Sequence, residues 1–594
     1  MRFRPAGWRE LNPLTQFVVA LSVATGAWVS SQAAQPCMKP VDGARIENGN
    51  AEARNWLSYG RTYSEQRFSP LTQINVDNGK NLGLAWFADL ETNRGQEATP
   101  LIVDGVVYIS TAWGLVKAYD GATGRLLWSY DPGVPREVRI TTCCDVVNRG
   151  VAAWNGKIFA ATLDGRLIAL QAATGKLVWS TLTVEPNKSY TITQAPRVIN
   201  GRVIIGSSGK QGTRGYISAY EAESGKFAWR FFTVPGDPSK PFEDQAMARA
   251  AKTWSGEWWM FGGGGAVSDS FSVDPKLNLL YFGTGSRDSS DGKRSLNRGD
   301  NLYIASILAL NADTGEYVWH YQVTPGDQWG YDASQQLVLA DLDLQGAPRE
   351  VVMQANANGY FYVLDRKTGA LISANTFVPI NWAAGIDAKT GRPTEGKDAR
   401  FSVSGQPVAI MPDPVGAHSW TPMAYNPNTG LVYIPAVEIA SHLLPVVKDP
   451  KYSPLGSKGG VGFTTTSEHR GFLLAWDPKA QREAWRVVYR DPWNGGIVTT
   501  AGNIVAQGDA AGNFNVYRAD TGKKLWSKFV QSGIVGGPST FEVDGEQYIT
   551  VLSGWSDVSP PKAENGAAGS GDLRKVSRIL TFKLGGTAVL PSSR

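Results

Sequence analysis

Apolar and polar residues alternate along most of the chain in short runs that turn residues interrupt. One unit recurs, in which an apolar segment ends in Ala-x-Asp-x-x-Thr-Gly and a second alternating segment follows with a Trp. It reads AYDGATGRLLW, ALQAATGKLVW, AYEAESGKFAW and ALNADTGEYVW at residues 118–128, 169–179, 219–229 and 309–319. Alternation on both sides of an Asp/Asn and Thr-Gly turn predicts two antiparallel strands joined by that turn.

Four weaker copies continue the series. They are VLDRKTGALIS, AYNPNTGLVYI, AWDPKAQREAW and VYRADTGKKLW at residues 363–373, 424–434, 475–485 and 516–526. Repeats of about 40–50 residues with several short strands each are typical of β-propellers. The sequence therefore predicts an all-β fold, an eight-bladed β-propeller with tryptophan-docking repeats, in which the Trp of six copies packs between blades.

The two ends of the repeat region also look like strands. GLAWFADL at 83–90 and RILTFKLG at 578–585 both alternate, and their pairing would close the ring and leave no open sheet edge. Two insertions interrupt the repeats, one at 232–265 with a helical pattern at 242–254, and one at about 375–416.

The N-terminus has the pattern of a secretory signal peptide. Three arginines precede an apolar run, Leu14 to Val29, and small residues follow it up to Ala33. This run is short for a membrane span of about 20 residues, so the pattern predicts cleavage of residues 1–33 and export. We expect a periplasmic protein without a membrane span after cleavage, made of one propeller domain over 34–594.

The net charge of the chain gives no support for two classes of partner, and its cysteines and histidines limit the disulfide, haem and metal chemistry that it can have. The net charge of +5 falls to +3 without residues 1–33, which gives no basis for binding nucleic acid or a membrane surface. Export permits a disulfide, and two of the three cysteines, Cys143 and Cys144, are neighbours, which leaves Cys37 over. The chain has no Cys-x-x-Cys-His, so it predicts no haem, and the four histidines fit no zinc pattern.

Several motifs coincide with the repeats: TTCCDVVNRG (141–150), TITQAPRVING (191–201), FTVPGDPSKPFE (232–243), GEWW (256–259), LDRKTG (364–369), PWNGG (492–496) and GWSD (554–557). Together they resemble the periplasmic quinoprotein alcohol dehydrogenases, over nearly all of the chain after residue 55. The resemblance implies pyrroloquinoline quinone (PQQ) in an eight-bladed propeller, between a vicinal disulfide and a tryptophan. It also implies a cation in the plane of the quinone, an aspartate that takes the proton of the alcohol, and a soluble electron acceptor such as a cytochrome c.

Many cofactor positions of that family match this chain. They are Glu97, Cys143, Cys144, Arg149, Thr193, Ser208, Gly209 and Trp493. In this resemblance the Cys143–Cys144 disulfide is a rigid plate for the quinone, and Arg149 pairs with one of its carboxylates.

The match fails where the metal and the base belong. The metal-binding glutamate, asparagine and aspartate of the family align with Gln211, Ser286 and Gly330, and that aspartate is also the catalytic base. The stacking tryptophan aligns with Ser268, and a basic residue aligns with Ala357. A hard cation needs several oxygen ligands, charged ones included. We therefore expect no metal at this degenerate site, neither calcium nor a lanthanide.

Two residues near these positions have open roles. Lys210 stands beside the lost glutamate, where its ammonium replaces part of the cation's charge or is simply solvated. Asp332 follows Gly330 by two residues, where it is a displaced general base or an ordinary loop residue.

Two functions follow from this sequence. The first is an oxidoreductase that oxidises a small alcohol with PQQ in an altered site and passes electrons to a soluble carrier. The second is a propeller that has lost PQQ and metal and uses the same central funnel as a non-redox enzyme or a binding protein.

Overall fold

Antiparallel sheets dominate the computed structural model, which describes residues 39–592 apart from 143, 187, 210–211, 270, 287–298, 345, 401–407, 445–461, 556–572 and 574–575. The predicted all-β class is confirmed. The described residues form one compact unit. Its α-helices and 3-10 helices are short: α1 (Gly43–Glu47), α2 (Gln245–Ala251), η1 (Gly79–Asn81), η2 (Ala112–Gly114), η3 (Arg136–Ile140) and η4 (Trp258–Phe261).

Eight sheets of four or five strands follow one another along the described chain. The first four contain β3 (Leu101–Val103), β4 (Val106–Ser110), β5 (Val116–Asp120) and β6 (Leu126–Tyr130); β7 (Ala152–Trp154), β8 (Lys157–Ala161), β9 (Arg166–Gln171) and β10 (Leu177–Leu182); β12 (Arg197–Ile199), β13 (Arg202–Gly206), β15 (Tyr216–Glu221) and β16 (Phe227–Phe232); β17 (Phe271–Asp274), β18 (Leu279–Gly283), β19 (Ser306–Asn311) and β20 (Tyr317–Gln322).

The other four sheets include two with an additional strand. They contain β21 (Val338–Leu344), β22 (Ala347–Ala355), β23 (Tyr360–Asp365) and β24 (Leu371–Thr376); β27 (Val408–Ile410), β28 (Ala424–Asn426), β29 (Leu431–Leu444), β30 (Gly462–Asp477) and β31 (Arg482–Tyr489); β1 (Phe68–Ser69), β32 (Asn494–Thr500), β33 (Ile504–Asp509), β34 (Asn513–Arg518) and β35 (Lys524–Phe529); β2 (Leu82–Asp89), β36 (Ser539–Val543), β37 (Glu546–Ser553) and β38 (Arg578–Leu584).

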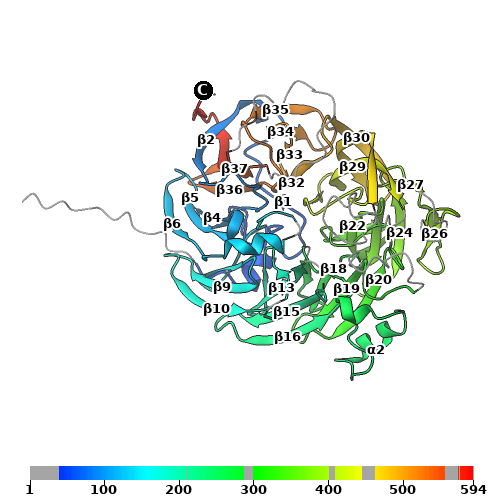
Figure 1. Cartoon of the computed structure of the whole chain (residues 1–594). Coiled ribbons are helices and arrows are strands. Elements are labelled where there is room, and N and C mark those ends of the chain that lie inside the picture. Colours follow the sequence, from blue (N-terminus) through cyan, green and yellow to red (C-terminus); the bar gives the residue numbers. More distant parts are fainter. Residues whose placement is uncertain are drawn as a thin grey trace, which may run out of the picture. The chain divides into compact units, whose positions relative to one another are not determined.

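The last sheet joins the two ends of the chain. β2 pairs antiparallel with β38, from Leu82 opposite Leu584 to Asp89 opposite Arg578, and Figure 1 shows the blue β2 beside the red strand near the C-terminus. The predicted pairing of the first and last strands is confirmed. Two small sheets lie outside this series, β11 (Tyr190–Thr191) with β14 (Ser208–Gly209), and β25 (Ala383–Ile386) with β26 (Pro393–Glu395).

The recurring Trp and Gly of the repeats meet between successive sheets. The Trp128 indole N–H donates to the carbonyl of Ala172, 2.9 Å away, in the next repeat. Gly175 of that repeat has φ +71°, and a Cβ on it would lie 2.5 Å from the Trp128 ring. The same contact joins further Trp and Gly residues: Trp86 and Gly124, Trp179 and Gly225, Trp229 and Gly315, Trp319 and Gly369, Trp485 and Gly522. The predicted docking role is therefore confirmed for the repeat tryptophans of these pairs, and Trp86 makes the same contact outside the repeats.

One segment near the N-terminus connects sheets that are far apart in the sequence. The Tyr63 hydroxyl donates to Val198 of β12, and the Gln66 amide donates to Leu339 of β21 (2.8 Å each). The buried Arg67 donates through Nε to Ile497 of β32 at 2.7 Å. Buried donors need such partners, so this segment fixes the sheets relative to one another beside the candidate site.

The first insertion contains the predicted helix. α2 lies within residues 242–254, and the Asp244 side chain caps it by accepting from the Met247 N–H at 2.7 Å. The second insertion contains β25, β26 and β27. In the part of the chain that the structure describes, no helix has the length and hydropathy to cross a membrane.

Candidate functional site

The predicted cofactor residues lie at one end of their sheets. Neighbouring strands are antiparallel, so the start of the first strand and the end of the second lie at the same end. Glu97, Arg149, Thr193 and Trp493 precede the first strands β3, β7, β12 and β32, and Ser208–Gly209 follows the second strand β13. The alternation of strands and turns in the sequence therefore brings these loops to a common end.

Arg149 is the centre of the cluster that the structure brings together. Its backbone N–H donates to the Thr193 carbonyl at 2.9 Å, and its own carbonyl accepts from the Thr99 N–H at 3.1 Å, so three successive loops are joined. Its side chain, in a residue only 5 % exposed, donates through Nε to Glu97 Oε2 at 3.0 Å and through Nη1 to the Ser268 carbonyl at 3.0 Å.

Acidic groups balance this buried guanidinium. Asp269 Oδ2 lies 4.0 Å from Arg149 Nε, in addition to the ion pair with Glu97. Burial raises the pKa of the Glu97 carboxyl above its ordinary value, and the charge of Arg149 opposes that rise. A cation fixed by its neighbours in a dry site is prepared to hold an additional anion without reorganisation.

Ser208 and Gly209, which follow β13, combine a polar side chain with a backbone that has no room for a side chain. The buried Ser208 hydroxyl has no hydrogen-bond partner among the described residues. A Cβ on Gly209 would lie 2.6 Å from the Ser189 carbonyl oxygen. An orphaned buried hydroxyl beside a backbone that admits no side chain fits a polar ligand here.

Trp493 is half-buried immediately before β32. The next side chain, Asn494, has a buried Oδ1 without a partner among the described residues. The described hydrogen bonds do not connect Trp493, Ser208 or Gly209 with Arg149, so the structure brings together Glu97, Arg149 and Thr193 and places the other three at the same end of their own sheets.

The cysteine pair is described in part. Cys144 is disulfide-bonded and exposed, whereas Cys143 lies outside the described residues, as do Cys37, Lys210, Gln211 and the predicted signal peptide. The vicinal pairing and the roles of Lys210 and Gln211 therefore stay predictions.

At Ser286 and Gly330, two positions of the predicted altered metal site, the described hydrogen bonds involve backbone groups. The Ser286 carbonyl accepts from the Gly265 N–H at 3.1 Å. Gly330, with φ +96°, donates its N–H to the Asp327 carboxylate at 3.2 Å. No cluster of three His, Cys, Asp or Glu side chains suited to a metal ion occurs in the described ranges. Ser286 and Gly330 thus offer no anionic side-chain oxygen, the kind of ligand that a hard cation needs.

Asp332 is held in a local turn. Its Oδ1 accepts from the Gln335 amide at 2.7 Å and from the Ser334 N–H at 3.4 Å. Burial raises the pKa of its carboxyl, whereas the two hydrogen bonds and, more weakly, the charge of Arg149 lower it. Asp332 therefore lies within the electrostatic reach of Arg149.

One residue of this site, Trp420, and a buried acid of the loop that contains it, Asp413, escaped the sequence prediction. The ring of Trp420 lies 4.6 Å from Arg149 Cζ, a cation–π contact across 271 positions of the sequence. Asp413 is buried in the loop that precedes the same strand, β28. The only sequence signals were an aromatic residue in GAHSW and an acid between two prolines in PDP.

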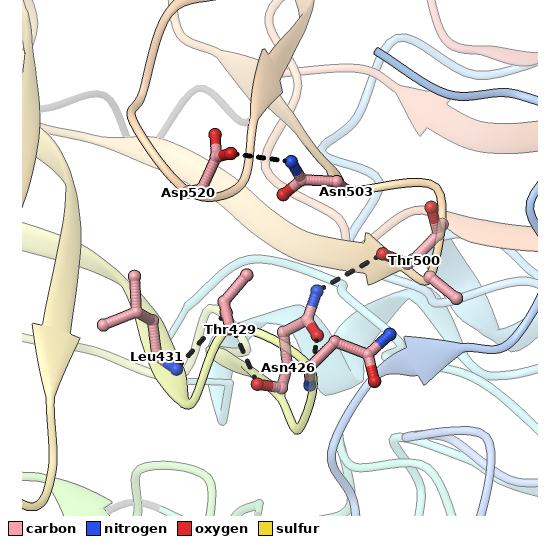
Figure 2. Close-up of a pocket in the computed structure, with 8 residues that line it drawn as sticks. Asn426, Thr429, Leu431, Thr500, Asn503 and Asp520 are labelled. Atoms are coloured by element: carbon pink, nitrogen blue, oxygen red, sulfur yellow. Dashed lines mark hydrogen bonds between the residues drawn. The ribbon is translucent and has the colours of Figure 1, made fainter.

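A separate pocket of about 350 Å³ lies away from these residues. Its lining includes Thr500, at the end of β32 opposite to Trp493. Figure 2 shows Asn503 donating to Asp520 on one side of this pocket and Asn426 donating to Thr500 on the other. It is therefore not the predicted cofactor site.

Comparison with known proteins agrees with the resemblance. The family "PQQ: Glucose/ethanol/alcohol dehydrogenase, beta-propeller domain" matches residues 56–394. The quinohemoprotein alcohol dehydrogenase ADH IIB of Pseudomonas putida is 50 % identical over 559 residues, which cover 93 % of this chain and 80 % of that protein. The chain belongs to the PQQ-dependent alcohol dehydrogenase family. It is an oxidoreductase of that family, and the predicted relationship is confirmed.

Other members show the same relationship. The crystal structure of the quinohemoprotein alcohol dehydrogenase of Comamonas testosteroni superposes with a TM-score of 0.86 at 47 % identity, covering 93 % of this chain and 84 % of that one. The 1-butanol dehydrogenase (cytochrome c) of Thauera butanivorans is 44 % identical and covers 91 % of this chain and 80 % of its own length.

The prediction of no haem is contradicted by these relatives. Several of them are quinohemoproteins, enzymes with a haem in addition to the quinone. The prediction was wrong because a missing Cys-x-x-Cys-His bears only on covalent attachment of haem to the residues of this sequence. The matched region is about 80 % of the relatives' length.

Proposed function

We propose that this protein oxidises a small alcohol with PQQ in a family site that has lost its cation. The observation that carries the proposal is Arg149, a buried guanidinium held by Glu97, the Ser268 carbonyl and the Trp420 ring. This cluster suits an anionic planar cofactor, because a guanidinium binds carboxylate in a fixed geometry and an aromatic face excludes water.

When bound, PQQ supplies the oxidant that receives the two electrons of the alcohol. Arg149 holds a carboxylate of the cofactor, and Thr193 and Ser208 supply hydroxyls at the same end of the sheets. The Cys143–Cys144 pair, as a disulfide, provides a flat contact for one face. The chain's own acids take up the proton that the alcohol releases, with Asp332 and Asp413 as candidates.

The proposal of an altered site rests on residues that the structure describes. Ser286, Gly330 and Ser268 offer no charged oxygen. In our proposal Lys210 supplies the missing positive charge, because Glu97 and Asp269 already balance Arg149. Neither calcium nor a lanthanide takes part in the reaction that we propose.

The architecture and location complete the proposal. The eight sheets are the blades of one eight-bladed propeller over 34–594, exported to the periplasm by residues 1–33. A cytochrome c is the electron acceptor that we propose, supported by the relative named 1-butanol dehydrogenase (cytochrome c).

A second candidate is favoured by the same replacements. Loss of the cation and of the family's aspartate at Gly330 costs nothing if the redox step has been abandoned, and the funnel then binds a different polar ligand. Failure of PQQ to bind would favour this candidate.

The test is calorimetric titration of the purified protein with PQQ after treatment with a chelator. We expect binding without metal that weakens at least tenfold in Arg149→Lys, because lysine keeps the charge and loses the planar fork. The control Arg349→Lys changes an exposed residue and should leave the affinity unchanged. Equal affinities in wild type and Arg149→Lys would contradict the role of Arg149.

A further inference from the structure

The loop 412–416 packs against two positions where this chain has lost the family's side chains. A Cβ on Gly330 would lie 3.3 Å from the Pro414 carbonyl oxygen, and a Cβ on Gly416 would lie 2.6 Å from Cβ of Ala357. The Ala417 N–H donates to the Ala357 carbonyl at 2.8 Å. This loop therefore lies directly beside Gly330 and is hydrogen-bonded to the backbone at Ala357.

Asp413 is the acid in this loop. The residue is 1 % exposed, its Oδ1 accepts from the Val415 N–H at 3.0 Å, and its buried Oδ2 has no hydrogen-bond partner in the described structure. One other described carboxylate oxygen, Asp274 Oδ2, is buried without a hydrogen bond, but it lies 2.7 Å from Arg366 in an ion pair. A buried carboxylate oxygen with neither a cation nor a donor is costly and calls for a ligand.

The charged and titratable groups that face this loop or lie on the elements packed against it have other described partners, and none is described as bonded to Asp413 Oδ2. Tyr331 donates its hydroxyl to the Pro412 carbonyl. Asp327 accepts backbone N–H groups, Glu438 on β29 pairs with Arg486, and Asp332 is held by Gln335. His418, in the same loop, has both ring nitrogens within 2.8 Å of the backbone carbonyls of Ala355 and Thr421. Burial raises the pKa of the Asp413 carboxyl to about 7, and the bonds from Val415 and Gly416 limit the rise.

We propose that Asp413 is the general base of the reaction and takes the hydroxyl proton of the alcohol at the place beside Gly330. The inference rests on the proposed function. The O–H bond of the alcohol breaks and its proton goes to Asp413 Oδ2, while the C–H bond breaks and its hydride, with two electrons, goes to the quinone. The alcohol becomes an aldehyde, the quinone is reduced, and Asp413 returns the proton to solvent.

Asp332 is the competing acid. Its Oδ1 is engaged by Gln335 and Ser334, so it would have to give up these bonds to accept a proton there. Asp413 Oδ2 has no hydrogen bond to give up in the described structure, which favours Asp413.

The experiment compares Asp413→Asn, Asp332→Asn and the exposed control Asp343→Asn in protein loaded with PQQ, with 1-butanol and a phenazine dye as electron acceptor. We expect Asp413→Asn to lower kcat about 100-fold or more with unchanged PQQ affinity, and Asp343→Asn to equal wild type. Formate should restore part of the activity of Asp413→Gly, because it replaces the missing carboxylate. Full activity of Asp413→Asn, or a loss confined to Asp332→Asn, would overturn the inference.

Two further measurements, PQQ binding by wild type and its pH profile, distinguish failure of the proposed function from failure of the role of Asp413. Wild-type protein that binds no PQQ overturns the proposed function itself, whereas binding with an active Asp413→Asn overturns only the role of Asp413. If Asp413→Asn does not fold, the wild-type pH profile decides, since kcat/KM must rise through one ionisation near pH 7, and a flat profile would contradict the inference.

Discussion

The Cζ atom of Arg149 lies 4.6 Å from the centroid of the Trp420 ring. Arg149 precedes β7 and Trp420 precedes β28, so the contact joins loops of two sheets that are far apart in the chain. It aligns a buried cation with a flat apolar surface, which together suit a planar anion.

Trp420 should therefore contribute to cofactor affinity. A cation–π contact of this kind is worth about 0.5–2 kcal/mol, so Trp420→Leu should weaken PQQ binding about 2- to 30-fold in a calorimetric titration. Trp128→Leu is the matched control, because it removes a docking tryptophan elsewhere and should lower the Tm without changing the PQQ affinity. Unchanged affinity in Trp420→Leu would show that this ring does not contact the cofactor.

The docking contacts predict a difference between two glycines. Gly175 and Gly156 have φ +71° and +73°, but a Cβ on Gly175 would lie 2.5 Å from the Trp128 ring, whereas a Cβ on Gly156 meets nothing within 4 Å. Gly156→Ala should lower the free energy of unfolding by about 1 kcal/mol for the backbone alone. Gly175→Ala should lower the free energy of unfolding by at least about 2 kcal/mol more, because the Trp128 ring must move. Urea unfolding measures both, and equal losses would contradict the docking account.

The pKa of Asp413 predicts how stability depends on pH. Its folded pKa of about 7 lies above the ordinary value of 3.8. Such a group stabilises the fold below its unfolded pKa, and this contribution is lost as the pH rises through the folded pKa. Wild type should therefore lose stability relative to Asp413→Asn between pH 4 and pH 8.

The control for this prediction is Asp520→Asn. The ion pair with Arg518 lowers the pKa of Asp520 to about 2, so its contribution is constant between pH 4.5 and pH 8. A pH-independent difference between wild type and Asp413→Asn would show that Asp413 titrates normally.

Lys210 offers a test of the proposal that the site works without a cation. If its ammonium supplies positive charge beside the quinone, Lys210→Ala should lower PQQ affinity strongly in a calorimetric titration, while thermal unfolding shows that the protein stays folded. Lys188→Ala, a change of an exposed lysine, is the control. Equal PQQ affinity in Lys210→Ala and wild type would show that Lys210 does not contribute to cofactor binding.

The architecture could be predicted because it is repeated in the sequence. Each Trp and each Thr-Gly recurs at a spacing that identifies strands and turns, and the terminal strands β2 and β38 alternate as a closing pair should. The site could be predicted only in part. Glu97 and Arg149 are 52 residues apart and were found through the family motifs, not through any local pattern.

Trp420 and Asp413 were missed for a physical reason. Their loop reaches Arg149, Gly330 and Ala357 only when the sheets assemble. No periodic pattern in the sequence predicts these long-range contacts. The haem prediction failed for another reason, because a motif reports on covalent attachment and not on every haem that serves an enzyme.

The most direct test of the account is the affinity for PQQ of the protein freed of metal by a chelator, measured again after calcium or a lanthanide is added. We predict tight binding without metal and no gain when either ion is added. Binding that appears only with calcium or a lanthanide would contradict the altered site, and no binding under any condition would contradict the quinoprotein function.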